Sequence, residues 1–204
     1  LWTVAYVGII KRGFKDKTSG MPLLVLGLNL AWEFCYAFLF TMQIPTQRVV
    51  NAIWFLFDIG IVFLKFKYGR DEFNSSLPGF RQSLFYPYLI VIMIFSFGVV
   101  FTARYEWNDL QGAYSAYLQN VFISSLFIPM LFRKGSTAGQ SMSIAICKCA
   151  GTLAPDMAGA YAIVTYIQAN MHCSVKEAFL LALDIRLHPM MKILIVMCFF
   201  FDVI

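Results

Sequence analysis

Charged side chains are scarce in this sequence: only 13% of its 204 residues are Asp, Glu, Lys or Arg, whereas 60% are hydrophobic. A soluble domain of this length has too much surface for its volume to hide so much apolar area. The mean hydropathy of +0.70 agrees with that argument. These values exclude an ordinary soluble protein, and we predict a protein that lies in a lipid bilayer.

The chain also lacks the patterns that would hold a metal ion or a disulfide framework. Its five cysteines lie mostly within apolar stretches, and Cys147 and Cys149 do not have the spacing of a zinc site. His172 and His188 have no partner at ligand spacing. We therefore interpret the thiols as small hydrophobic side chains, and we expect no metal and no cofactor.

A basic stripe with interleaved aromatic residues is absent too, although the net charge is +5. The basic residues lie in loops instead, which excludes nucleic acid as a partner. They concentrate in residues 11–17, 65–81 and 133–134. The positive-inside rule places these three loops in the cytosol, so the N-terminus is expected on the opposite side.

What the sequence does have is long, continuous apolar runs. About 20 apolar residues cross a bilayer core of ~30 Å, and continuous rather than alternating runs indicate helices rather than a barrel. We predict an all-α membrane protein, a seven-transmembrane-helix bundle forming one domain over residues 1–204, with the first and last helices cut short. The expected spans are 1–10, 22–41, 49–66, 84–103, 113–132, 143–168 and 189–204.

Glu33 lies near the middle of the second apolar run. An acid at the centre of a membrane helix costs roughly 2.5–3.5 kcal/mol, so such an acid is a candidate functional residue. Asp202 lies at a similar depth in the last run, each acid being about 18–20 Å from the face at which its segment enters. We expect the two carboxyl groups to share one cavity if their helices are neighbours. Two carboxyls in a poorly hydrated cavity cannot both ionise at low cost, so one could donate a proton.

Several neighbours of Glu33 are candidate substrate-binding residues. Asn29 and Tyr36 share its helix face, so they could orient or hydrogen-bond the carboxyl group. Trp32 and Trp54 could stabilise a carbocation through their ring quadrupoles, although plain packing is the more frequent role.

The remaining intramembrane charges have structural alternatives. Asp58 could line the same cavity, or it could make an interhelical hydrogen bond. Lys148 and Asp156 are eight residues apart in the sixth run. Each could form a salt bridge with the other or with a third helix.

Residues 29–36 read Asn-Leu-Ala-Trp-Glu-Phe-Cys-Tyr. This segment resembles the Asn-x-x-Trp-Glu-x-x-Tyr signature of the integral-membrane terpene cyclases of fungal meroterpenoid and indole-diterpene pathways, the pyripyropene- and paspaline-type cyclases. Residues 15–21 resemble that family's basic loop ending in Thr-x-Gly-Met, and Asp202 resembles its second acidic position. Asp184 is a competing late acid, but it lies nearer the interface, so we prefer Asp202.

The resemblance implies a hydrophobic prenylated polyketide or indole substrate with a terminal epoxide. A protonated acid opens the epoxide, or protonates the end alkene, and a cation cascade closes rings without a metal. The two acids implied are Glu33 and Asp202. The chain has neither an Asp-Asp-x-x-Asp nor an Asp-x-Asp-Asp run, which agrees with chemistry that releases no diphosphate. A multi-pass protein of the endoplasmic reticulum membrane is expected.

Three other functions remain open at this point. Related membrane proteins of polyketide pathways open epoxides with water or catalyse other cyclisations. A proton-coupled transporter could use Glu33 and Asp202 as a relay, although no internal repeat of transporter type is present. A seven-helix receptor is the third alternative, and the short loops count against it.

Overall fold

The computed structural model describes residues 1–42, 44–76, 82–183 and 188–203, and all the regular elements in these ranges are helical. The predicted all-α class is therefore confirmed for this part of the chain. The elements are α1 (Trp2–Asp16), α2 (Leu23–Phe34), the π-helical turn η1 (Cys35–Leu39), α3 (Pro45–Ser76), the 3-10 turn η2 (Gln82–Leu84), α4 (Phe85–Glu106), α5 (Ala113–Lys134), α6 (Met142–Met171), α7 (Val175–Ala182) and α8 (Pro189–Val203).

Three helical stretches among the described residues are long and apolar enough to cross a membrane: Pro45–Phe73, Gln82–Glu106 and Ala113–Lys134. They correspond to the third, fourth and fifth predicted spans. Leu23–Leu39 is a shorter apolar helix. The first, sixth and last predicted segments fall on α1, α6 and α8, so each predicted span is helical over most of its described length. Seven membrane crossings nevertheless remain a prediction.

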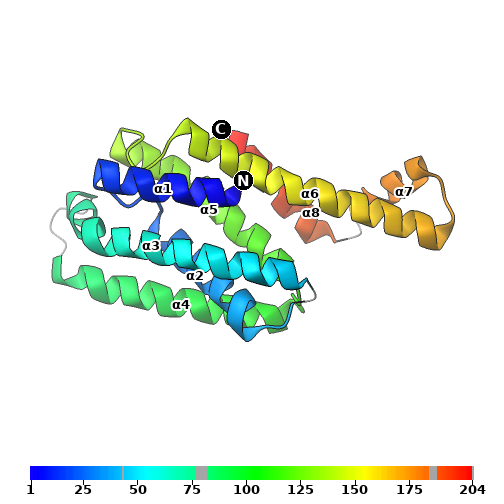
Figure 1. Ribbon diagram of the computed structural model, residues 1–204, viewed down its shortest axis with the longest axis horizontal. Coiled ribbons are helices and arrows are strands. Elements are labelled where there is room, and N and C mark those ends of the chain that lie inside the picture. The colour runs from blue at the N-terminus through cyan, green and yellow to red at the C-terminus, as the bar shows by residue number, and fades with distance from the viewer. Residues whose placement is uncertain (43, 77–81, 184–187, 204) are drawn as a thin grey trace.

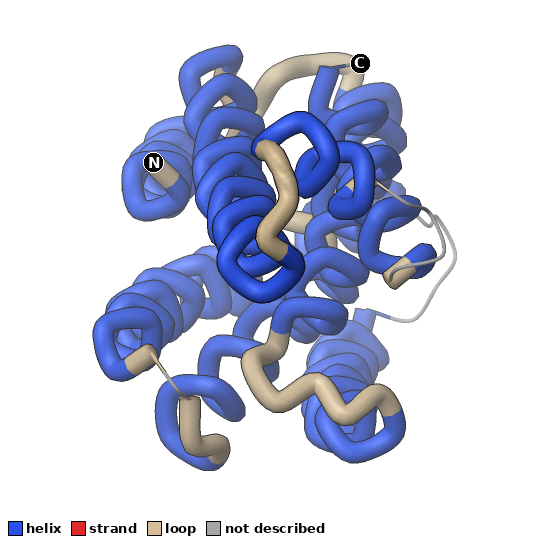
Figure 2. The backbone as a smooth tube through the Cα atoms, turned by 90° about the vertical axis from the view of Figure 1, so that its right-hand side faces the viewer, coloured by secondary structure: helices blue, strands red, loops and turns tan. Residues whose placement is uncertain are grey.

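The helix α2 occupies the centre of the bundle, where it packs against α3, α4 and α5. The helix α1 packs against α3 and α6, and α8 packs against α5 and α6 (Figure 1). Figure 2 shows the same bundle from its end, with helices surrounding the interior. The outward side chains of α4 are large and apolar, and Ile94 is 67% exposed. Such a surface is suited to lipid contact.

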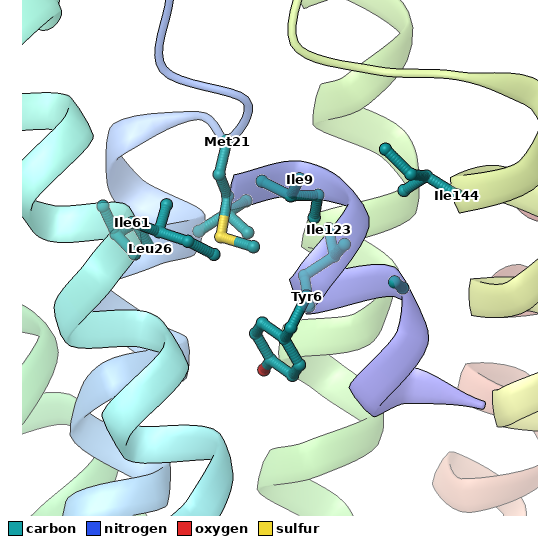
Figure 3. Close-up of a cluster of buried hydrophobic side chains, with 9 residues drawn as sticks. Tyr6, Ile9, Met21, Leu26, Ile61, Ile123 and Ile144 are labelled. Carbon is teal, nitrogen blue, oxygen red and sulfur yellow. The ribbon is translucent and has the colours of Figure 1, made fainter. Parts of the chain in front are cut away.

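A cluster of buried hydrophobic side chains joins α1, α2, α3, α5 and α6 (Figure 3). Tyr6 of α1 belongs to this cluster, and its hydroxyl points away from the neighbouring aliphatic side chains. The ring of Tyr6 stacks on Phe57 of α3 with a centroid distance of 6.1 Å. The cluster therefore holds a phenol group at a fixed place inside the bundle.

Glu72, near the end of α3, ties three segments of the chain together. It accepts hydrogen bonds from the backbone N–H of Ser19 at 2.8 Å and the Ser19 hydroxyl at 2.6 Å, and from the hydroxyl of Thr18. Its carboxylate also lies 3.8 Å from the Lys65 ammonium and 3.3 Å from that of Lys134. The three basic segments of the sequence thus meet at one end of the bundle, as expected if all three lie on the same side of the membrane.

The helix α7 lies between the predicted spans 143–168 and 189–204, in a stretch where the apolar runs predict no helix. It begins with a capping box in which the Ser174 hydroxyl accepts from the Glu177 N–H and the Glu177 carboxylate accepts from the Ser174 N–H. The Ser-x-x-Glu spacing before an apolar run is a known start signal for a helix. The sequence therefore contained the information that would have identified α7.

Candidate active site

A cavity of about 330 Å³ lies between α1, α2, α3, α5 and α6. Its lining combines aromatic rings with carboxyl, amide and hydroxyl groups. The residues that matter for its chemistry are Trp2, Tyr6, Asn29, Trp32, Glu33 and Trp54 from the first three helices, and Tyr117, Gln119, Asn120 and Thr152 from α5 and α6. An apolar cavity with a few convergent polar groups is the usual form of a small-molecule site.

Glu33 is the acid of this lining, and the hydrogen bonds that it accepts from N–H and O–H groups reach one of its oxygens. Oε1 accepts a hydrogen bond of 2.5 Å from the Tyr6 hydroxyl and one of 3.0 Å from the Asn29 amide. Oε2 is buried and accepts no hydrogen bond from an N–H or hydroxyl group in the part of the chain that the structure describes. The carboxyl group also shares a hydrogen bond with that of Asp58. Only 1% of the residue is exposed, and it reaches the cavity as part of its lining.

Asn29 connects Glu33 to a second acid, Asp58. Its amide nitrogen donates to Oδ2 of Asp58 at 2.9 Å and also to the Tyr6 hydroxyl. Asp58 is fully buried but is not part of the cavity lining, so it makes the interhelical contact that was its structural alternative. Among the described residues, no ion pair involves either acid.

The indole of Trp32 is fixed by the loop that precedes α5. Its Nε1 donates to the Gly112 carbonyl at 3.1 Å and to the Ser115 hydroxyl at 3.0 Å. A Cβ at Gly112, where φ is +75°, would lie 2.9 Å from the Trp32 ring. Trp54 also lines the cavity, with its Nε1 donating to Thr3 at 3.1 Å. Both predicted tryptophans therefore present rings to the cavity.

Tyr36 does not contact the Glu33 carboxyl, which corrects the expectation from their helical spacing. Its hydroxyl donates to the Asp109 carbonyl at 2.8 Å. The residue lies in the π-helical turn that starts at Cys35, where the chain no longer follows α-helical spacing. Tyr36 instead packs against Trp32, with ring centroids 4.9 Å apart. It supports the cavity wall from behind.

Asp202 lies apart from Glu33, so the predicted shared cavity is also corrected. The Lys148 ammonium forms a buried salt bridge with Asp202 and donates to the Ser124 hydroxyl at 2.6 Å. Asp202 is not among the cavity-lining residues. The depth argument concerns only the level of the two acids in the bilayer and does not say which helices are neighbours. The helix α8, which carries Asp202, packs on α5 and α6. The competing acid Asp184 lies outside the described residues.

Comparison with known proteins identifies the family. The sequence profile of the Pyr4-like transmembrane terpene cyclases matches residues 1–204. The chain belongs to this family. It is 32% identical over 160 residues to the Pyr4-family terpene cyclase mfmH of Annulohypoxylon moriforme, which covers 74% of this chain and 62% of that protein. It is 27% identical over 156 residues to the asnovolin H synthase nvfL of Aspergillus novofumigatus, covering 76% of this chain and 64% of the relative.

A third relative, the terpene cyclase ascF of Acremonium egyptiacum, is 26% identical over 189 residues, or 83% of this chain and 67% of that protein. The chain spans less than two thirds of the length of mfmH and nvfL. No solved structure matches it. The resemblance inferred from residues 29–36 is thus confirmed: the chain belongs to a family of transmembrane proteins whose relatives are named terpene cyclases.

Two features of the Pyr4-like site were not found from the sequence. Tyr6 belongs to a short apolar run, and nothing in that run indicates that its hydroxyl meets Glu33. Tyr117 of α5 donates a hydrogen bond to Oδ1 of Asp156 on α6. From the sequence, only a salt bridge was expected for Asp156. Lys148, for its part, makes its salt bridge with a third helix, one of the two alternatives.

Proposed function

We propose that this membrane-bound cyclase protonates the terminal epoxide, or the end alkene, of a prenylated polyketide or indole and directs its cationic polycyclisation without a metal ion. Glu33 is the proton donor. The observation that carries the proposal is the setting of its carboxyl group: Glu33 lines the cavity, Oε1 accepts two hydrogen bonds from neutral donors, and the group shares a hydrogen bond with the Asp58 carboxyl, which requires one of the two acids to hold a proton.

This arrangement suits an acid that starts neutral and ends charged. In an apolar cavity, and with no ion pair to Glu33 among the described residues, the neutral carboxylic acid is the less costly form to bury. After transfer of the proton from Oε2, the carboxylate keeps the hydrogen bonds from Tyr6 and Asn29. Hydrogen bonds to a charged acceptor are about twice as strong as neutral ones. Tyr6 and Asn29 therefore stabilise the Glu33 carboxylate that develops in the transition state more than they stabilise the neutral acid of the ground state.

The aromatic lining serves the cation that forms after protonation. A cation within ~6 Å of an aromatic centroid gains about 0.5–2 kcal/mol from the ring quadrupole. Trp2, Trp32 and Trp54 present such rings, and they also exclude water that would otherwise quench the cation. The names of the relatives, terpene cyclases and one asnovolin H synthase, support this class of chemistry.

We assign Asp202 to a positioning role: it holds Lys148 behind the wall formed by α5 and α6. Asp58 acts through its hydrogen bonds with Asn29, which also bonds Glu33, and with the Glu33 carboxyl group itself. We further propose that the protein resides in the endoplasmic reticulum membrane, where hydrophobic prenylated intermediates would reach the cavity from the bilayer.

The proposal is tested with the full-length protein in microsomes and a phenol carrying a farnesyl chain with a terminal epoxide. The expected product of the unaltered protein is a cyclised isomer of the same mass. Glu33→Gln keeps the shape and the hydrogen bonds but cannot donate an acidic proton, so substrate consumption is expected to stop. Glu106→Gln, at an exposed position, is the matched control and should behave like the unaltered protein.

Three results would overturn the proposal. The first is normal cyclisation by Glu33→Gln. The second is an uncyclised product one water heavier from the unaltered protein, which would indicate an epoxide hydrolase. The third is solute flux in proteoliposomes with no chemical change in the substrate, which would indicate a transporter.

A further inference from the structure

A second acid lies against the cavity wall, on the α5–α6 side. Tyr117 lines the cavity, and its hydroxyl donates to Oδ1 of Asp156 on the neighbouring helix. The other oxygen, Oδ2, is buried and has no hydrogen-bond partner among the described residues. Tyr117 and Asp156 therefore form a phenol–carboxyl pair whose phenol belongs to the same cavity as Glu33.

This pair differs from the other acid behind the same wall. Asp202 is held by the ammonium of Lys148 and does not belong to the cavity lining. The hydrogen bond that Asp156 receives comes from a neutral phenol, and no salt bridge to Asp156 is present among the described residues. Lys148 is thus engaged by Asp202, and Asp156 is the carboxyl group that is bonded to a residue of the cavity lining.

A proton-initiated cyclisation that ends in an alkene needs such a base. One proton enters at the epoxide oxygen, and one proton must leave from a carbon next to the last cation. The remaining polar groups on the α5–α6 side of the lining, Gln119, Asn120 and Thr152, are amides and a hydroxyl, which are very weak bases. The Tyr117–Asp156 pair can therefore accept the proton that leaves the substrate. Glu33 could accept it only by taking back the proton that it had donated.

We propose that Tyr117 and Asp156 form the proton-accepting relay that ends the cyclisation, an inference that rests on the proposed function of Glu33. The C–H bond beside the cationic carbon breaks, and its electron pair becomes the new C=C π bond. The released proton passes to the Tyr117 oxygen as the phenol proton passes to Oδ1 of Asp156. Asp156 then releases this proton to solvent and Glu33 takes one up, so the cycle is balanced. Tyr117 is the catalytic residue, and Asp156 acts through it.

The test separates initiation from termination by product mass. With the epoxyfarnesyl phenol and the full-length protein in microsomes, Asp156→Asn should consume substrate at a rate within a few-fold of the unaltered protein, because Glu33 is untouched. Formation of the isomeric alkene should fall about 100-fold, the lower end of what a general base contributes. The cation is then trapped by water, giving cyclised alcohols one water heavier than the substrate.

Tyr117→Phe is the second variant, and it should give the same shift to cyclised alcohols while preserving the ring that packs against α8. Asp156→Glu, which restores a carboxylate, should recover part of the alkene. The relay is refuted if both Asp156→Asn and Tyr117→Phe give the alkene product at the normal rate and ratio. It is also refuted if substrate consumption and alkene formation fall equally in both variants, because a purely structural role would do that. Failure of the proposed function differs, since it appears as an unaltered protein that forms no cyclised product.

Discussion

The Tyr6 hydroxyl donates a 2.5 Å hydrogen bond to Oε1 of Glu33, which joins the first helix of the chain to the candidate catalytic acid on the second. Both residues are almost completely buried. The bond engages Oε1 and so orients the carboxyl group within the cavity lining.

Replacing Tyr6 by Phe removes the donor but keeps the ring that stacks on Phe57. We expect turnover to fall about 10- to 100-fold, because a hydrogen bond to a charged acceptor contributes roughly 1.5–3 kcal/mol. Initial rates of substrate consumption in microsomes measure the effect. Tyr161→Phe, at a position that is 76% exposed, is the control and should leave the rate unchanged. An unaltered rate in Tyr6→Phe would show that this bond plays no part in proton transfer.

Replacing Gly112 by Ala should damage the cavity wall. A Cβ there would come within 2.7 Å of the Tyr36 ring and 2.9 Å of the Trp32 ring, and φ is +75°. Gly135→Ala is a matched control, because φ is +58° but no atom lies within 4 Å of the added carbon. The left-handed backbone alone costs about 1–2 kcal/mol in both variants.

Thermal unfolding of the two glycine variants in detergent separates backbone strain from the clash. Overpacking should make Gly112→Ala less stable than Gly135→Ala by about 1–3 kcal/mol. Gly112→Ala should also lose activity as Trp32 shifts. Equal melting temperatures and equal activities of the two variants would contradict the close packing of the loop against the rings.

Replacing Lys148 by Met should strongly destabilise the fold, because it leaves the buried carboxylate of Asp202 without its cation. Breaking a buried ion pair in this way costs about 3–5 kcal/mol, whereas replacing both partners with apolar residues is often neutral. The double variant Lys148→Met/Asp202→Leu should therefore regain most of the stability in a detergent melt. Turnover by the double variant then decides the role of Asp202: retained activity indicates positioning, and abolished activity in a stable protein indicates chemistry.

Replacing Glu72 by Gln should loosen the end of the bundle where the basic segments meet. The variant loses the charge that faces Lys65 and Lys134, and we expect a loss of stability of about 2 kcal/mol. Asp71→Asn, one residue earlier and exposed, is the control and should melt like the unaltered protein. Turnover per folded molecule should be unchanged in both variants, since Glu72 does not line the 330 Å³ cavity.

Much of the fold followed from the sequence because bilayer physics leaves few choices. Long apolar runs must be helical, and an acid such as Glu33 must face the interior. Side-chain partners between helices were not predictable in the same way. Similar depth did not make Glu33 and Asp202 neighbours, because the order of helices around a bundle does not follow from their hydrophobicity. Tyr6 was missed for the same reason, since its partner is set by how α1 packs on α3 and α6.

Within one helix, spacing was a better guide, and its failure has a local cause. Asn29, four residues before Glu33, does bond the acid as predicted. Tyr36, three residues after it, does not, since the π-helical turn begins between them at Cys35. The α-helical spacing therefore predicted the contact on the N-terminal side of Glu33, where the helix is regular. It failed on the C-terminal side, where the π-helical turn begins.

That π-helical turn makes the site sensitive to chain length. A π turn contains one more residue than an α turn, so deleting a single residue from Cys35–Leu39 would restore α geometry. Each following residue would then rotate by about 100° about the helix axis relative to Glu33. The Ala37 carbonyl would leave Arg48, which now donates to it at 2.6 Å. A one-residue deletion, with no change in charge, would thus break a contact between the end of the α2 segment and the first turns of the helix that supplies Trp54.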